Sequence, residues 1–130
     1  MGEAMRKIRY ILTSLALLLG LSTPATAQTD EAVELRVMIF NVWLGGEQVN
    51  IGRVYDAIRA AKADIVMLQE PEGQTRAFAA TLGYPYASER HHIISQYPLF
   101  DPPAADADYA LVELRPGRFV AVSNLSLIHI

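Results

Sequence analysis

The sequence predicts an α/β fold built around a mixed β-sheet. Two observations carry this prediction. The first half of the mature chain reads as strand, helix, strand and helix, whereas the second half holds short strands separated by turn and loop signals. A strand–helix–strand unit makes neighbouring strands parallel, and tight turns make them antiparallel. We therefore expect one domain with both kinds of pairing, and the sequence contains no internal repeat or low-complexity run.

Residues 1–27 have the pattern of a cleavable signal peptide. Three basic residues precede an apolar run at residues 10–21, and an Ala-x-Ala-like site ends at Ala27. The apolar run is shorter than the roughly 20 residues that a membrane span needs. The alternatives are a membrane anchor or a retained helix. We expect an exported protein, in the periplasm or outside the cell, with no stable membrane span after cleavage.

Charge and composition restrict the domain that follows. The chain has 130 residues and no Cys, and residues 28–130 carry 8 basic and 13 acidic residues, a net charge of −5. A mildly acidic chain lacks the electrostatic footprint for tight duplex binding. Without disulfides, an apolar core must stabilise the fold. We expect a loose polar lead-in at residues 28–34 and the domain at residues 35–130.

The first half of the domain should contain two strands joined by a helix. Residues 35–43 are β-branched, aromatic and mostly apolar, which predicts a strand that ends at Gly45-Gly46. Asn50 is a good helix N-cap, and an apolar stripe follows it at helical spacing. The stripe consists of Ile51, Val54, Tyr55, Ile58 and Ala61. Residues 65–69 are predicted to form a buried strand that Pro71 terminates, and Pro71 should hold Glu70 extended.

The second half should contain a helix followed by short strands. Residues 74–82 are predicted to form a helix with Gly83 as its C-terminal cap. The remaining expected segments are an extended stretch at 84–87, a strand at 93–95, a loop at 101–108 and strands at 109–114 and 119–127. The last two strands flank a turn at 115–118 and should pair as a hairpin.

Glu70 is the leading candidate for a functional residue. It stands at the carboxyl end of a central strand, where open α/β sheets bind their ligands. A carboxylate buried there must pair, take up a proton or hold a metal. The alternative is that Glu70 simply emerges into solvent at the strand end.

Three motifs occur in order along the chain. They are Phe40-Asn41-Val42-Trp43, then Asp64 to Glu70 with its closing Leu-Gln-Glu, and then Ile94-Ser95-Gln96-Tyr97-Pro98-Leu99. A strand at 119–124 then leads into Asn124. This series resembles the endonuclease/exonuclease/phosphatase family over residues 35–124. Gln96 replaces an Arg that is usual in that family.

The resemblance implies a four-layered αββα sandwich that hydrolyses phosphoester bonds with a divalent metal. It makes Glu70 the ligand of Mg²⁺, with Mn²⁺ as an alternative, and it makes Asn41 a residue that orients the metal shell or a phosphate oxygen. Asn41 has an alternative role in satisfying backbone groups at the strand end. Asn124 and Trp43 become candidate substrate-binding residues, although a Trp in this position is more often part of the core. The substrate would be a nucleic acid, a phospholipid headgroup or a sugar phosphate.

The sequence departs from the family near its end. Ser126 stands where the family's Asn-x-His-Leu motif has its catalytic His, and the later Asp-x-Asn and Asp-His pairs do not follow. Residues 125–130 also resemble translated sequencing-adapter read-through. We therefore expect the N-terminal part of a truncated, incomplete domain that is inactive by itself, and a monomer at full length. The alternative is a non-catalytic secreted binding module.

Two further expectations concern the second half of the domain. The family's second sheet should be missing, which would leave the 109–127 hairpin with an unpaired apolar edge. The adjacent residues His91 and His92 should point in opposite directions and should not share a metal.

Overall fold

A computed structural model describes residues 32–104 and 106–125. The chain divides into two units after Ala32, and all the elements named below belong to the second unit, which begins at Val33. The predicted signal peptide, most of the lead-in and Ser126 lie outside the described residues. No helix within the described ranges is long and apolar enough to span a membrane.

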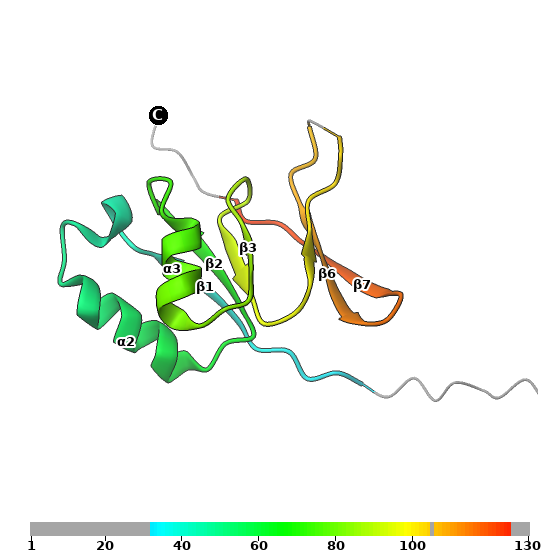
Figure 1. The fold of residues 1–130 in the computed structure, drawn as a ribbon, viewed down its shortest axis with the longest axis horizontal. Helices are drawn as coiled ribbons and strands as arrows, with labels where there is room; N and C mark the ends of the chain where they lie inside the picture. The colour runs from blue at the N-terminus through cyan, green and yellow to red at the C-terminus, as the bar shows by residue number, and fades with distance from the viewer. Residues whose placement is uncertain (1–31, 105, 126–130) are drawn as a thin grey trace, which may run out of the picture. The chain divides into compact units, whose positions relative to one another are not determined.

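The structure confirms the α/β class and the mixed sheet. Strand β1 (Val37–Asn41) lies parallel to β2 (Ile65–Gln69), and helix α2 (Ile51–Ala61) connects them (Figure 1). Strand β4 (Ile93–Ser95) pairs antiparallel with β2, and β3 (Tyr86–Ser88) pairs antiparallel with β4. The resulting order is β1-β2-β4-β3, so the Ile65–Gln69 strand is central as predicted.

A second sheet follows, and its existence corrects the expectation of a missing partner sheet. It contains β5 (Leu99–Phe100), β6 (Ala110–Arg115) and β7 (Arg118–Val122) in that order. The predicted hairpin is present as β6 and β7, but β7 ends at Val122, five residues before the predicted end at 127. Strand β5 was not predicted. Strand β7 is the edge of this sheet and exposes Phe119, as expected for an apolar edge.

Local sequence signals define both helices. Asn50 caps α2, and its Oδ1 accepts a hydrogen bond from the Gly52 N–H at 3.0 Å. Val54 and Ile58 of the apolar stripe are buried. Helix α3 (Thr75–Leu82) ends at Gly83, whose φ of 78° is the left-handed conformation that glycine adopts most easily.

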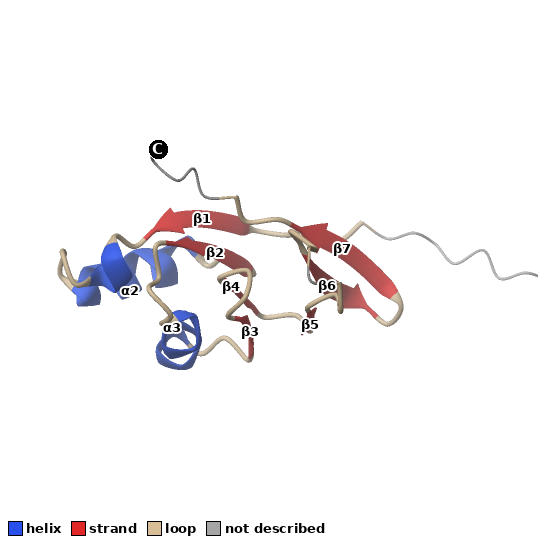
Figure 2. Cartoon of the chain, turned by 90° about the horizontal axis from the view of Figure 1, so that it is seen from above, coloured by secondary structure: helices blue, strands red, loops and turns tan. Residues whose placement is uncertain are grey.

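The two faces of the first sheet contribute to two separate cores. The alternation of β2 sends Val66 and Leu68 toward the helices and sends Ile65 and Met67 toward the second sheet. Both helices lie on the same side of β1 and β2 (Figure 2). The described residues therefore form a helical layer and two sheets, while the fourth layer of an αββα sandwich stays a prediction.

Candidate functional site

The candidate site lies where β1 and β2 end side by side. Asn41 and Gln69 are register partners in the parallel pair, and the Val42 N–H donates to the Gln69 carbonyl oxygen at 2.9 Å. Glu70 is the next residue along the chain. The Asn41 side-chain Nδ2 donates to Glu70 Oε1 at 2.8 Å. The two residues singled out in the sequence therefore face each other and touch.

A second hydrogen bond fixes the direction of the Asn41 amide. Its Oδ1 accepts from the Trp43 backbone N–H at 2.8 Å, so the oxygen is engaged by the backbone and the NH₂ group faces Glu70. An amide nitrogen donates hydrogen bonds and does not coordinate cations. Asn41 is thus placed to orient the Glu70 carboxylate, and it also satisfies a backbone group at the strand end. The alternative role of satisfying a backbone group is therefore present, and the orientation of a metal shell or a phosphate oxygen by Asn41 stays a prediction.

The backbone around this contact is strained. Glu70 has a φ of 55°, and Trp43 and Leu44 have φ values of 51° and 50°, all in the left-handed region that non-glycine residues rarely adopt. The expectation that Pro71 would hold Glu70 extended was therefore wrong. The Glu70 carbonyl oxygen accepts a hydrogen bond from the Gly45 N–H at 2.8 Å, and this tertiary contact helps to hold the backbone conformation of Glu70. Such residues each cost about 1–3 kcal/mol and occur preferentially at functional sites.

A hollow of about 510 Å³ opens beside Asn41, between the end of β1 and the start of α2. Its lining consists of Phe40, Asn41, Val42, Trp43, Val49, Asn50, Arg53 and Val54. Trp43 is 56% exposed, so the interpretation of Trp43 as a core residue was wrong. The positive φ at Trp43 and the Asn41 hydrogen bond set the course of the backbone here, and neither is visible in the local sequence pattern.

The donor chemistry of the site fits a Mg²⁺ ion held largely by water and substrate. Glu70 is half-buried and supplies a carboxylate at the sheet edge. Mg²⁺ sites of this kind use one or two carboxylates, several waters and substrate phosphate oxygens. Across residues 32–104 and 106–125, no group of three or more His, Cys, Asp or Glu side chains is arranged to hold a metal ion. Glu70 is the residue that would hold one, with Asn41 orienting its carboxylate.

Asn124 bonds the backbone near the end of the central strand, and its role in substrate binding stays a prediction. Its Nδ2 donates to the Leu68 carbonyl oxygen at 2.8 Å and to the His91 carbonyl oxygen at 3.1 Å. Its Oδ1 is buried without a hydrogen-bond partner among the described residues. The segment after β7 is thereby tied to the central strand. The NH₂ group of Asn124 is fully engaged with backbone, and only its oxygen has hydrogen-bonding capacity left.

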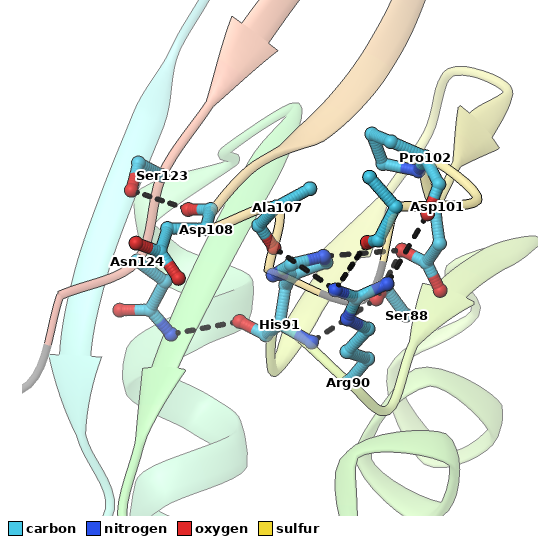
Figure 3. Close-up of polar contacts among 10 residues, drawn as sticks. Ser88, Arg90, His91, Asp101, Pro102, Ala107, Asp108, Ser123 and Asn124 are labelled. Carbon is cyan, nitrogen blue, oxygen red and sulfur yellow. Dashed lines mark hydrogen bonds and ion pairs between the residues drawn. The ribbon is translucent and has the colours of Figure 1, made fainter.

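The two histidines point to different partners, as their adjacency predicted. His91 is buried, and its Nε2 lies 3.8 Å from Asp101 Oδ1, whereas His92 Nδ1 lies 3.2 Å from Thr75 Oγ1. Figure 3 shows His91 between Asn124 and Asp101. Asp101 also accepts from Ser88 Oγ at 2.6 Å.

Arg90 organises the loop that precedes β6, a role that sequence reasoning missed. Its guanidinium donates to the carbonyl oxygens of Pro102, Ala104 and Ala107 at 3.1, 2.8 and 3.2 Å (Figure 3). These contacts go to backbone oxygens, which any residue type supplies. The sequence therefore carried no signal for them.

Comparisons of the chain with models of protein families, with curated protein sequences and with solved structures find no match. The chain's own residues, above all the contact between Asn41 and Glu70, therefore provide the indication of its function.

Proposed function

We propose that the chain is the N-terminal part of an exported, Mg²⁺-dependent phosphoester hydrolase of the endonuclease/exonuclease/phosphatase type. The observation that carries the proposal is the 2.8 Å hydrogen bond from Asn41 Nδ2 to Glu70 Oε1. It joins the carboxyl ends of two adjacent parallel strands, which is where α/β sheets bind ligands. The motifs at residues 40–43, 64–70 and 94–99 support the same family.

In this proposal Glu70 binds the metal and Asn41 holds the carboxylate in place. A Mg²⁺ ion there would neutralise charge on the phosphoryl oxygens and on the leaving group. Asn41 contributes no charge of its own, so it orients Glu70 without competing for the cation. Hydrogen bonds hold the backbones of Glu70 and Trp43 at the strand ends, where α/β sheets bind ligands. Mn²⁺ is an alternative cation because it accepts the same oxygen ligands.

We expect the chain by itself to have no hydrolase activity. The resemblance places Ser126 where the family has its catalytic His, and Ser is not a proton shuttle near neutral pH. The members of such a site act as a unit, so one carboxylate leaves little catalytic power. The measurement is hydrolysis of bis-(p-nitrophenyl) phosphate with Mg²⁺. Clear turnover that Glu70→Ala abolishes would contradict this expectation, while supporting the role of Glu70.

Metal binding tests the proposal directly. Mn²⁺ is titrated into the chain, and the loss of the free-ion signal is followed by electron paramagnetic resonance. We expect binding that Glu70→Gln removes, because the amide has no negative charge for the cation. Glu72→Gln is the matched control, since Glu72 lies two residues away, is exposed and has the same side chain. Equal Mn²⁺ binding by both variants would refute the proposed metal site.

A further inference from the structure

The hollow beside Asn41 combines an apolar lining with a single charge. Four of its residues are apolar and form its lining with two Asn residues, one Trp and one Arg. Among these residues Arg53 carries the only charge, and none of them is acidic. Its volume of about 510 Å³ lies within the roughly 300–1,000 Å³ range of small-molecule sites. A ligand that fits must therefore offer an apolar surface and negative charge.

Trp43 is held at this hollow without being buried in the core. The residue is 56% exposed, and its backbone has a strained conformation with φ at 51°. The N–H donates to Asn41 Oδ1 at 2.8 Å, and the carbonyl oxygen accepts from the Gly46 N–H at 3.0 Å. The amide that orients Glu70 thus also positions Trp43. An exposed aromatic ring on a held backbone is a stacking surface for a flat ligand group.

Arg53 supplies the positive charge at the same place. On the same helix, Arg59 is paired with Asp56 at 3.4 Å, whereas no acidic side chain in the described part of the chain forms an ion pair with Arg53. Arg53 is exposed and lines the hollow. A guanidinium binds phosphate oxygens well because its planar donors match their geometry.

We propose that the hollow binds a nucleotide, with the base stacked on Trp43 and the phosphate paired with Arg53. A choline phosphate headgroup fits less well, because its ammonium group is not flat and offers no planar face to the Trp43 ring. A sugar phosphate lacks the flat apolar face. The assignment of a nucleotide ester as the substrate rests on the proposed hydrolase function, whereas binding of the nucleotide in the hollow does not.

Trp43 provides the readout, because it is the only Trp in the chain. AMP, adenosine, inorganic phosphate and phosphocholine are titrated into the chain without divalent metal while Trp fluorescence is recorded. We expect saturable quenching by AMP, weaker binding of adenosine and no response to phosphate or phosphocholine. Arg53→Met should weaken AMP binding about tenfold and leave adenosine binding unchanged. Arg53→Lys should restore part of the loss because it keeps the charge.

Arg76→Met is the matched control, since Arg76 is an exposed helical arginine on α3 that does not line this hollow. It should bind AMP like the unaltered chain, and circular dichroism verifies that each variant is folded. Absence of AMP quenching, or equal AMP affinity in Arg53→Met and Arg76→Met, would overturn the nucleotide site. Tighter binding of phosphocholine than of AMP would overturn the ligand class. Absence of Mn²⁺ binding by the unaltered chain is a separate outcome that contradicts only the hydrolase proposal.

Discussion

Replacing Asn41 by Asp exchanges the side-chain NH₂ group for an oxygen at the centre of the candidate site. The variant keeps an oxygen for the Trp43 N–H, which the Asn41 Oδ1 accepts at 2.8 Å. It replaces the NH₂ that donates to Glu70 Oε1 at 2.8 Å with a second carboxylate oxygen. The substitution thus preserves the backbone contact and removes the contact between the two side chains. We expect lower stability without metal and a larger gain in stability with metal.

The size of the stability loss depends on how exposed the Asn41–Glu70 hydrogen bond is. A hydrogen bond to a charged group contributes about 1.5–3 kcal/mol in general, and an exposed one is nearer about 1 kcal/mol. Two carboxylates about 4 Å apart repel by about 1 kcal/mol in water. The loss of folding free energy is therefore about 2 kcal/mol, which lowers the Tm by roughly 8–16 °C for a domain of this size.

Urea and thermal unfolding, with and without Mg²⁺, provide the assay. Asn50→Asp is the control, because Asn50 is a helix N-cap and Asp caps a helix as well as Asn does. We expect Mg²⁺ to recover most of the loss in Asn41→Asp, since the ion binds two facing carboxylates in the folded state alone. Equal stability of the two variants without metal would refute the coupling between Asn41 and Glu70. Failure of Mg²⁺ to stabilise Asn41→Asp would refute the metal site.

Two more substitutions test contacts away from the site. Tyr84 donates its O–H to the Ala63 carbonyl oxygen at 2.7 Å, and burial, followed by the nearby Asp64 carboxylate, raises its pKa above 10.0. A raised pKa in the folded state stabilises the fold at pH values below 10.0, and this contribution is lost as the pH rises through the folded-state pKa. Urea unfolding should therefore show the unaltered chain losing stability above about pH 10 more steeply than Tyr84→Phe does, and parallel profiles would contradict this. Asn124→Asp places a carboxylate oxygen against two backbone carbonyl oxygens and should cost about 2–4 kcal/mol in the same assay, whereas a change below about 0.5 kcal/mol would show that these contacts do not hold the segment.

The sequence predicted those parts of the fold that depend on neighbouring residues. The strand at 65–69 was predicted with both of its ends and the helix after Asn50 with its start, because an apolar run and a capped helical stripe are local patterns. The Gly83 cap was predicted for the same reason. The contact between Asn41 and Glu70 was predictable in outline, since adjacent parallel strands bring their carboxyl ends to one edge.

The features that depend on distant contacts were missed. Strand β5 exists because Leu99 pairs with Val112, and two residues after Tyr97-Pro98 carry no strand signal of their own. The left-handed conformation of Glu70 opposes the local preference before Pro71, and a hydrogen bond from Gly45 accompanies it. Whether Trp43 is buried depends on which other elements pack against it, and the tertiary fold decides this.

Asn41 connects the parts of the candidate site, because its amide nitrogen and its amide oxygen each bind a residue with a strained backbone. Its nitrogen orients the Glu70 carboxylate and its oxygen holds the Trp43 backbone, so one amide links the two residues. An Asn that merely satisfied a strand end would need only one of these contacts. The strain at Glu70 and Trp43 costs about 1–3 kcal/mol for each residue, and the exposed Trp43 side chain recovers little of its share through burial. The proposed ligand site would use both residues, and for this reason Asn41 is the residue on which the proposed function depends.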